Sequence, residues 1–211
     1  QPLRDLIGTC TEETQQRFFD LLALDPHLFW IEDPEEFRSE VVEHYVALLR
    51  SNRQPSARIR AMQAVALFAE RRSVPILETS LTRDPNAMVR AQALASLGQF
   101  LEVPELLDRL VLATRDPADD VRLQAAHTLG GLNADDVKPH RDQLIELLET
   151  ENDELQEAVC QLLSKCYRRD WRDLADRLMG AERSASLRGL IRTLSLIGDP
   201  QIGVLFLPIL D

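Results

Sequence analysis

The sequence is poor in the features that mark secreted and membrane proteins. Its 211 residues include three cysteines, an odd number in no spacing typical of a metal site or a disulfide framework. No apolar run is long enough to span a bilayer, and no charged and then apolar leader precedes a small-residue cleavage site. We therefore expect a cytoplasmic protein without membrane insertion.

The sequence also lacks the motifs of common catalytic and metal sites. It contains no glycine-rich phosphate loop, no pair of histidines in the spacing of a zinc protease and no serine elbow. Its four histidines are scattered, and its paired acids, such as Asp119-Asp120 and Asp135-Asp136, lie at predicted helix starts, where the helix dipole favours negative charge. We expect no enzymatic activity, no cofactor and no metal.

Basic residues are few, since 24 lysines and arginines face 35 acids and the net charge is −11. Nucleic-acid phosphates demand a basic face, so this balance disfavours nucleic-acid binding. The charge is −8 over residues 1–49, +5 over 50–100, −10 over 101–160 and +2 over 161–211. Solvated helix faces explain this distribution, and a bipolar surface matched to a charged partner is the alternative.

What the sequence does contain is an internal repeat. The segment LTRDPNAMVRAQALASLG (81–98) aligns with ATRDPADDVRLQAAHTLG (113–130), and ten of the 18 positions are identical. From residue 52 onward apolar residues recur at helical spacing, and proline and glycine interrupt the pattern at short intervals. A single helical hairpin cannot bury its apolar face, so this pattern predicts hairpins that stack on one another.

The repeat divides the chain into predicted elements. Second helices of the hairpins are expected near 56–70, 86–99, 118–131, 153–166 and 185–197, and shorter first helices at 73–82, 104–115, 138–149, 171–179 and 201–210. A helix over 35–51, starting after the Asp33-Pro34 cap, would pair with 56–70. We expect residues 1–34 to form an N-terminal helical cap and 35–211 to form one continuous solenoid.

The second helices can be aligned on an apolar residue followed by arginine or glutamine. The aligned pairs are Ile59-Arg60, Val89-Arg90, Val121-Arg122, Leu155-Gln156 and Leu187-Arg188, with spacings of 30, 32, 34 and 32 residues. This register predicts a buried stripe at positions −1, +3 and +7 from the polar residue of each pair. It also places Asp84 and Asp116 as N-caps, with Pro85 and Pro117 at the first helical position.

The pattern D-P-x-x-x-V-R-x-x-A-x-x-x-L-G, present with one residue of slack at 84–98 and 116–130, resembles the HEAT repeat in its short bacterial form. It is similar to phycobilisome-lyase HEAT-like repeats, over about residues 55–211, and is weakest where Gln156 replaces arginine. The resemblance implies an all-α, right-handed, armadillo-like α-solenoid of about five to six repeats. It also implies irregularity near Gln156 and a hydrogen-bonded ladder between neighbouring repeats through Asp84, Arg90, Asp116 and Arg122.

In such a stack the second helices line the concave face, which is our candidate for binding another protein. Its outward positions, +1 and +5 in the register above, carry small or apolar residues in three successive repeats, with arginines beside them. This groove suits an acidic or amphipathic peptide helix, and the alternative is that close packing buries these positions. The candidate residues are Arg58, Arg60, Ala61, Val65, Arg90, Ala91, Ala95, Arg122, Leu123 and His127.

We predict a non-catalytic protein-binding scaffold or adaptor, and we expect the chain to be a region of a longer protein. Trp171, with Arg168 and Arg172, is a secondary candidate contact, although a tryptophan in this position is more often a core residue. The family resemblance leaves one alternative function, a lyase-type or chaperone-type factor for attaching bilins to phycobiliproteins, which nothing beyond the repeat supports. Nucleic-acid binding is a third possibility that the net charge disfavours.

Overall fold

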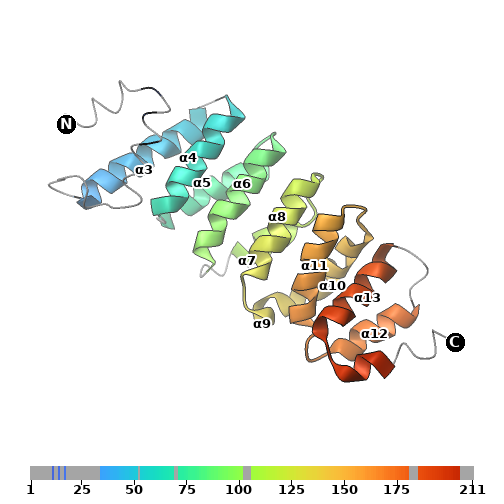
Figure 1. Ribbon diagram of the computed structural model, residues 1–211. Helices are drawn as coiled ribbons and strands as arrows, with labels where there is room; N and C mark the ends of the chain where they lie inside the picture. Colours follow the sequence, from blue (N-terminus) through green and yellow to red (C-terminus); the bar gives the residue numbers. More distant parts are fainter. Residues whose placement is uncertain are drawn as a thin grey trace. The chain divides into compact units, whose positions relative to one another are not determined.

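A computed structural model of the chain describes residues 11, 14, 17, 34–51, 53–68, 71–101, 106–180 and 185–204. These ranges consist of α-helices and short 3-10 helices joined by turns, without a strand (Figure 1). The predicted all-α class is thereby confirmed. None of the helices in these ranges is long and apolar enough to cross a membrane. The predicted cap at 1–34 falls almost entirely outside them, and the single continuous solenoid over 35–211 stays a prediction.

The chain divides into two compact units, and the first spans residues 1–100. Its elements are α3 (Pro34–Ser51), α4 (Pro55–Phe68), η2 (Arg71–Ser73), α5 (Val74–Arg83), α6 (Ala87–Leu97) and η3 (Gly98–Phe100). Within it α4 packs against both α3 and α6, and α5 packs against α6. Figure 1 shows α4 and α6 in one layer, with α5 behind them. Unit 1 is therefore a two-layered stack of hairpins, as the repeat predicts.

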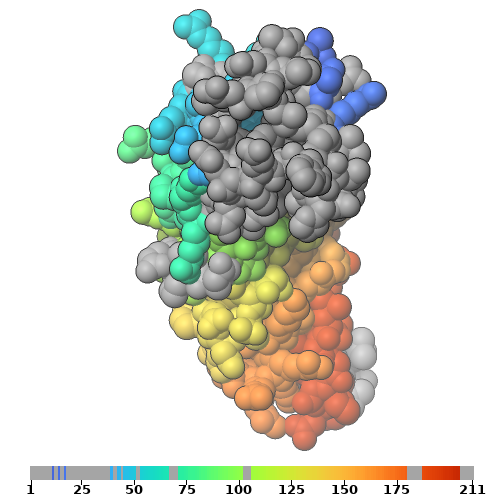
Figure 2. Space-filling model, turned by 90° about the vertical axis from the view of Figure 1, so that its left-hand side faces the viewer, coloured from blue at the N-terminus to red at the C-terminus, as the bar shows by residue number. Residues whose placement is uncertain are grey.

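The second unit spans residues 101–211 and stacks in the same way. Its elements are α7 (Leu106–Ala113), α8 (Asp119–Gly130), α9 (Ala134–Val137), η4 (Lys138–His140), α10 (Arg141–Ile145), η5 (Glu146–Glu149), α11 (Asp153–Cys166), α12 (Trp171–Gly180) and α13 (Ala185–Ile197). Here α11 packs between α8 and α13, while α7 and α12 pack against α8 and α13 respectively. The orange and red residues of α11, α12 and α13 lie against one another in Figure 2.

The predicted buried stripe is confirmed in the three middle second helices, α6, α8 and α11. Its members are at most 1% exposed, and they are Val89, Ala93, Leu97, Val121, Ala125, Leu129, Leu155, Val159 and Leu163. These positions follow one side of each helix, so each helix turns the same side toward the core.

The predicted register is wrong in α4. Gln63, which it places in the buried stripe, is exposed, whereas Ala57, Ala61 and Val65 are buried. These three residues precede Val89, Ala93 and Leu97 by 32 residues each. The arginine of this repeat is therefore Arg58, which keeps the 32-residue period, and the alignment on Ile59-Arg60 lies two residues too late.

The last second helix, α13, also departs from the predicted register, by one residue in the same direction. Leu190 and Leu194 are buried, while Ile191 and Ser195, which the register places in the core, are exposed. Gly189 accounts for this rotation. A Cβ atom there would lie 2.8 Å from a methyl group of Leu148, so α13 approaches η5 with the one residue that has no side chain.

The Asp-Pro pairs lie outside the second helices and do not cap them, contrary to the prediction. The N-caps are Asn86 and Ala118, two residues after Asp84 and Asp116. Asp84 instead ends α5 in an extended conformation, as expected for a residue before proline. Its Oδ1 accepts a hydrogen bond of 2.9 Å from the Asn86 backbone N–H, so the aspartate orders the turn between the two helices.

The segment predicted as one helix over 138–149 is broken into η4, α10 and η5. Pro139 lies inside η4, where its missing N–H is compatible with a short 3-10 turn but interrupts a continuous helix. This break lies in the first helix of the repeat whose second helix contains Gln156. The irregularity expected near Gln156 is thereby confirmed.

Candidate protein-interaction surfaces

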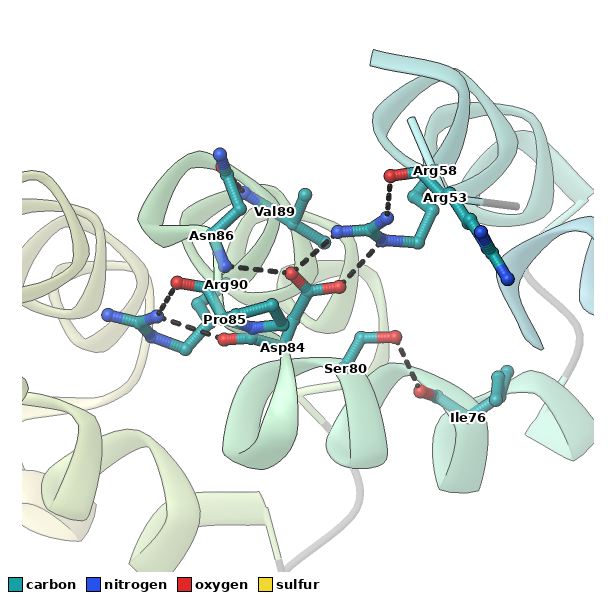
Figure 3. Close-up of polar contacts among 9 residues, drawn as sticks. All are labelled: Arg53, Arg58, Ile76, Ser80, Asp84, Pro85, Asn86, Val89 and Arg90. Carbon is teal, nitrogen blue, oxygen red and sulfur yellow. Dashed lines mark hydrogen bonds and ion pairs between the residues drawn. The ribbon is translucent and has the colours of Figure 1, made fainter. Parts of the chain in front are cut away.

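A buried ion pair joins α4 to the turn between α5 and α6. Arg58 donates from Nε and Nη2 to the two carboxylate oxygens of Asp84, at 2.7 and 2.8 Å, and from Nη1 to the Arg53 carbonyl at 3.1 Å (Figure 3). The Arg58 and Asp84 side chains are only 11% and 8% exposed. This bidentate pair holds neighbouring repeats together. Arg58 is thus a structural residue, and its predicted place beside an open groove is wrong.

The arginines of the next two second helices hold their own turns. Arg90 donates from Nη1 to the carbonyls of Asp84 and Pro85, at 2.9 and 3.3 Å (Figure 3). Arg122 donates from Nη1 to the Asp116 carbonyl at 3.1 Å and forms an ion pair with Asp119. The predicted ladder residue Asp84 does bind an arginine of the preceding repeat, and that arginine is Arg58.

In unit 2 a different polar contact links neighbouring repeats. Asn152, the N-cap of α11, donates from Nδ2 to the Asp119 carboxylate at 3.2 Å. The same asparagine accepts from the Leu155 backbone N–H at 3.0 Å, so it caps its own helix while it contacts the start of α8. This contact could not be predicted from the sequence, because an asparagine at this position indicates only a helix cap.

On the corrected register the outward positions of unit 1 form what we call the second-helix face. It consists of the side chains at positions +1, +2 and +5, all half-buried or exposed, and it carries no acid: Ile59, Arg60, Gln63, Ala91, Gln92 and Ala95. Gln63 Nε2 donates to Gln92 Oε1 at 3.2 Å, which ties the two helices together across this face. The predicted exposure of Ala61 and Val65 is wrong, since both are at most 1% exposed.

The corresponding side chains of unit 2 are more polar. Leu123 is half-buried and His127 is exposed, as predicted, and the following helix presents Glu157 and Gln161. Glu157 is engaged by an ion pair with Arg192 of α13. Unit 2 thus carries an acid at an outward position, whereas the second-helix face of unit 1 carries none.

The secondary candidate, Trp171, is a core residue. Its side chain is 6% exposed, and Nε1 donates to the Asp199 carboxylate at 3.0 Å. The Arg172 guanidinium lies 4.9 Å from the ring centroid and Arg168 is exposed, but the indole itself is covered. Trp171 therefore secures the start of α12 and does not offer the open aromatic contact that we had considered.

A charged cluster ties η4 and α10 to the start of α12, and sequence reasoning missed it. Asp170 accepts from Lys138 at 2.5 Å and from Arg141 at 3.0 Å, and Arg141 also bonds Asp173 at 3.1 Å. The hydrogen bonds from Lys138 and then Arg141 lower the pKa of Asp170. The Arg141 guanidinium also lies 4.6 Å from the ring centroid of the buried Tyr167.

The two cysteines that the structure describes are buried. Burial raises the pKa of both the Cys160 and the Cys166 thiol, and Cys160 donates to the Gly189 carbonyl at 3.4 Å. A raised pKa leaves little thiolate at neutral pH, which is the opposite of what a nucleophile or metal ligand needs. Cys10 lies outside the described residues.

These hairpins, their 32-residue period and the Arg58–Asp84 pair can now be set against known proteins. Residues 42–140 match the family model for HEAT repeats. This match supports the HEAT-repeat family. The matched range includes part of α3 and all elements from α4 through η4, and no curated protein matches the chain. HEAT repeats commonly act as protein-interaction scaffolds, because stacked hairpins present extended binding surfaces.

Proposed function

We propose that this chain is a non-catalytic scaffold that binds another protein through the second-helix face of unit 1. The observation that carries the proposal is the composition of that face on the corrected register. Surface helices usually present charged residues, yet five of its six positions are uncharged: Ile59, Gln63, Ala91, Gln92 and Ala95. An outward face that is small, uncharged and partly apolar is suited to contact with a protein surface.

The charge around this face supports an acidic or amphipathic helix as the partner. Residues 50–100 carry a net charge of +5, and Arg60 belongs to the face itself. Small side chains such as Ala91 and Ala95 allow a partner helix to approach closely. Apolar contact along one side of that helix would supply affinity, while its acids would be guided by the positive potential.

A pair of variants tests this proposal. Gln63→Glu/Ala95→Glu adds two negative charges to the face, and Thr79→Glu/Thr82→Glu adds the same charge to exposed positions of α5. Tagged wild-type and variant chains would be used to retain proteins from a lysate of the source organism, after circular dichroism has shown equal helix content. We expect a protein that the wild type and the α5 variant retain and that the face variant loses, because charge repulsion opposes its acidic helix.

The outcomes distinguish a wrongly assigned surface from a wrongly assigned function. If the face variant retains the same protein as the wild type, the chain is a scaffold but the second-helix face is the wrong surface. If the wild type retains nothing beyond an untagged control, the scaffold proposal itself is contradicted.

A further inference from the structure

A leucine-lined cleft of about 700 Å³ opens in unit 2, beside the turn between α8 and α9. Leu106 and Leu110, both buried, line it together with the half-buried Leu101, Leu107 and Leu132. This volume is in the range that admits a small ligand or a few side chains of a bound peptide. The cleft is separate from the second-helix face, which belongs to unit 1.

The polar part of the cleft lining is acidic. Among the described residues that line the cleft, Asn133, Asp135 and Asp136 are exposed, and none is a lysine or an arginine. Asn133 is the N-cap of α9, yet its side chain makes no capping hydrogen bond. Within the part of the chain that the structure describes, the Asp135 and Asp136 carboxylates have no hydrogen-bond or ion-pair partner. The cleft thus combines an apolar lining with two uncompensated negative charges.

The cation nearest along the chain does not neutralise these acids. Lys138 follows Asp136 by two residues, but its Nζ lies 2.5 Å from Asp170, in the cluster that ties η4 to the start of α12. Other acids of unit 2 are paired with a cation, as Asp142 of α10 is with Arg177. Residues 101–160 carry a net charge of −10, so the potential around the cleft favours a positively charged ligand.

We propose that this cleft binds a basic, amphipathic helix of another protein. Aliphatic side chains of the helix would enter between Leu107 and Leu132, and its lysines or arginines would pair with Asp135 and Asp136. An uncharged apolar ligand would cover the two carboxylates without offering them a partner, which is costly. An acidic helix would be repelled by them. The proposal concerns a second surface and does not depend on the face in unit 1.

A designed peptide provides the probe. A fluorescein-labelled helix with leucines at i, i+3, i+4 and i+7 and lysines elsewhere would be titrated with the full chain, and its anisotropy recorded. The test variant is Asp135→Asn/Asp136→Asn, and the matched control is Glu151→Gln/Glu154→Gln, which removes the same charge from exposed sites around the start of α11. We expect the test variant to bind about tenfold more weakly than the control, with a shallower dependence on salt.

Two further measurements examine the apolar part of the cleft. Leu132 lies in a turn, and Leu132→Gln should weaken binding of the lysine peptide by about tenfold. A peptide with glutamate in place of lysine should not bind the wild type. In the wild type, backbone amide chemical shifts should move around Leu107, Leu132 and Asp136 when the lysine peptide is added. Equal affinity of the test and control variants, or shifts confined to other elements, would overturn the proposal. Unchanged binding by Gln63→Glu/Ala95→Glu would show that the two surfaces are independent.

Discussion

The turn before α6 and the turn before α11 have the same local form but different chemistry. Before α6, the Asp84 carboxylate accepts hydrogen bonds from the Asn86 backbone N–H and from Nε and Nη2 of Arg58. Before α11, Thr150 Oγ1 accepts from the Asn152 backbone at 3.1 Å, but a hydroxyl cannot pair with a guanidinium as a carboxylate does. The turn is therefore retained where the ion pair is absent.

The two second helices that follow these turns also differ in the hydrogen bonds made by Arg90 and Gln156. Arg90 donates to the carbonyls of its own turn, whereas Gln156 donates from Nε2 to the Leu148 carbonyl in η5, at 3.1 Å. In the same region a partly exposed cluster of Lys138, Arg141 and Asp170 links the broken first helix to α12. The repeat therefore places different requirements on its turns and on the contacts between its hairpins. The turn needs only a side-chain acceptor, while the contacts between hairpins can be buried ions, amides or surface charges.

The largest expected effect is at the regular turn. Asp84→Ala leaves Arg58 as a buried charge without its partner, and removing one member of such a pair costs about 3–5 kcal/mol of folding free energy. Urea unfolding monitored by circular dichroism would measure this loss. A cost below about 1 kcal/mol would show that the pair behaves as an exposed one and would contradict its assigned role.

An intermediate effect is expected at the irregular repeat. Gln156 is 7% exposed, so Gln156→Ala leaves the Leu148 carbonyl without this donor, at a cost of about 1–3 kcal/mol. Hydrogen exchange should show faster opening of η5 and α11, with unit 1 unaffected. Gln161→Ala, at an exposed position of the same helix, is the control and should change stability little.

The smallest effect is expected at the charged cluster, and it depends on pH. The pKa of Asp170 is lowered in the folded protein, so its ionised form stabilises the fold at pH values above the ordinary aspartate pKa of about 3.9. That contribution is lost as the pH falls through the lowered pKa. The difference in stability between the wild type and Asp170→Asn should be present at neutral pH, be reduced by salt and vanish in acid.

Thiol labelling measures directly how Asp170→Asn changes the opening of the helices around the charged cluster. Cys166 lies on α11 near Lys138 and Arg141 and is buried, so it reacts only when the surrounding helices open. In a chain carrying Cys10→Ser, Asp170→Asn should raise the rate of Cys166 alkylation at neutral pH. Equal rates in the two chains would show that the cluster does not restrain α12.

Much of the fold could be predicted from the sequence because the repeat is local. The bounds of α11 and α13 agree with the predicted 153–166 and 185–197, since proline, glycine and helical periodicity mark them. The register of α4 is ambiguous in the sequence because Ala57-Arg58-Ile59-Arg60 contains two apolar-arginine pairs, of which Ile59-Arg60 is the more apolar. Burial of Arg58 depends on the distant Asp84, which periodicity alone does not reveal.

The surfaces were less predictable than the helices. The leucine-lined cleft depends on how α7 meets the turn after α8, and the cluster around Asp170 joins residues about 30 positions apart. Neither has a spacing signature within one repeat. Trp171 was ambiguous in the sequence, and its burial together with its hydrogen bond to Asp199 assigns it to the core.

The most direct test of the corrected register is a comparison of two double-mutant cycles measured by urea unfolding. One cycle combines Arg58→Met with Asp84→Ala, and the other combines Arg60→Met with the same change at Asp84. The structure predicts a coupling free energy above about 1 kcal/mol for Arg58 and Asp84, and close to zero for Arg60 and Asp84. Coupling of Asp84 to Arg60 and not to Arg58 would contradict the 32-residue register and, with it, the composition of the second-helix face.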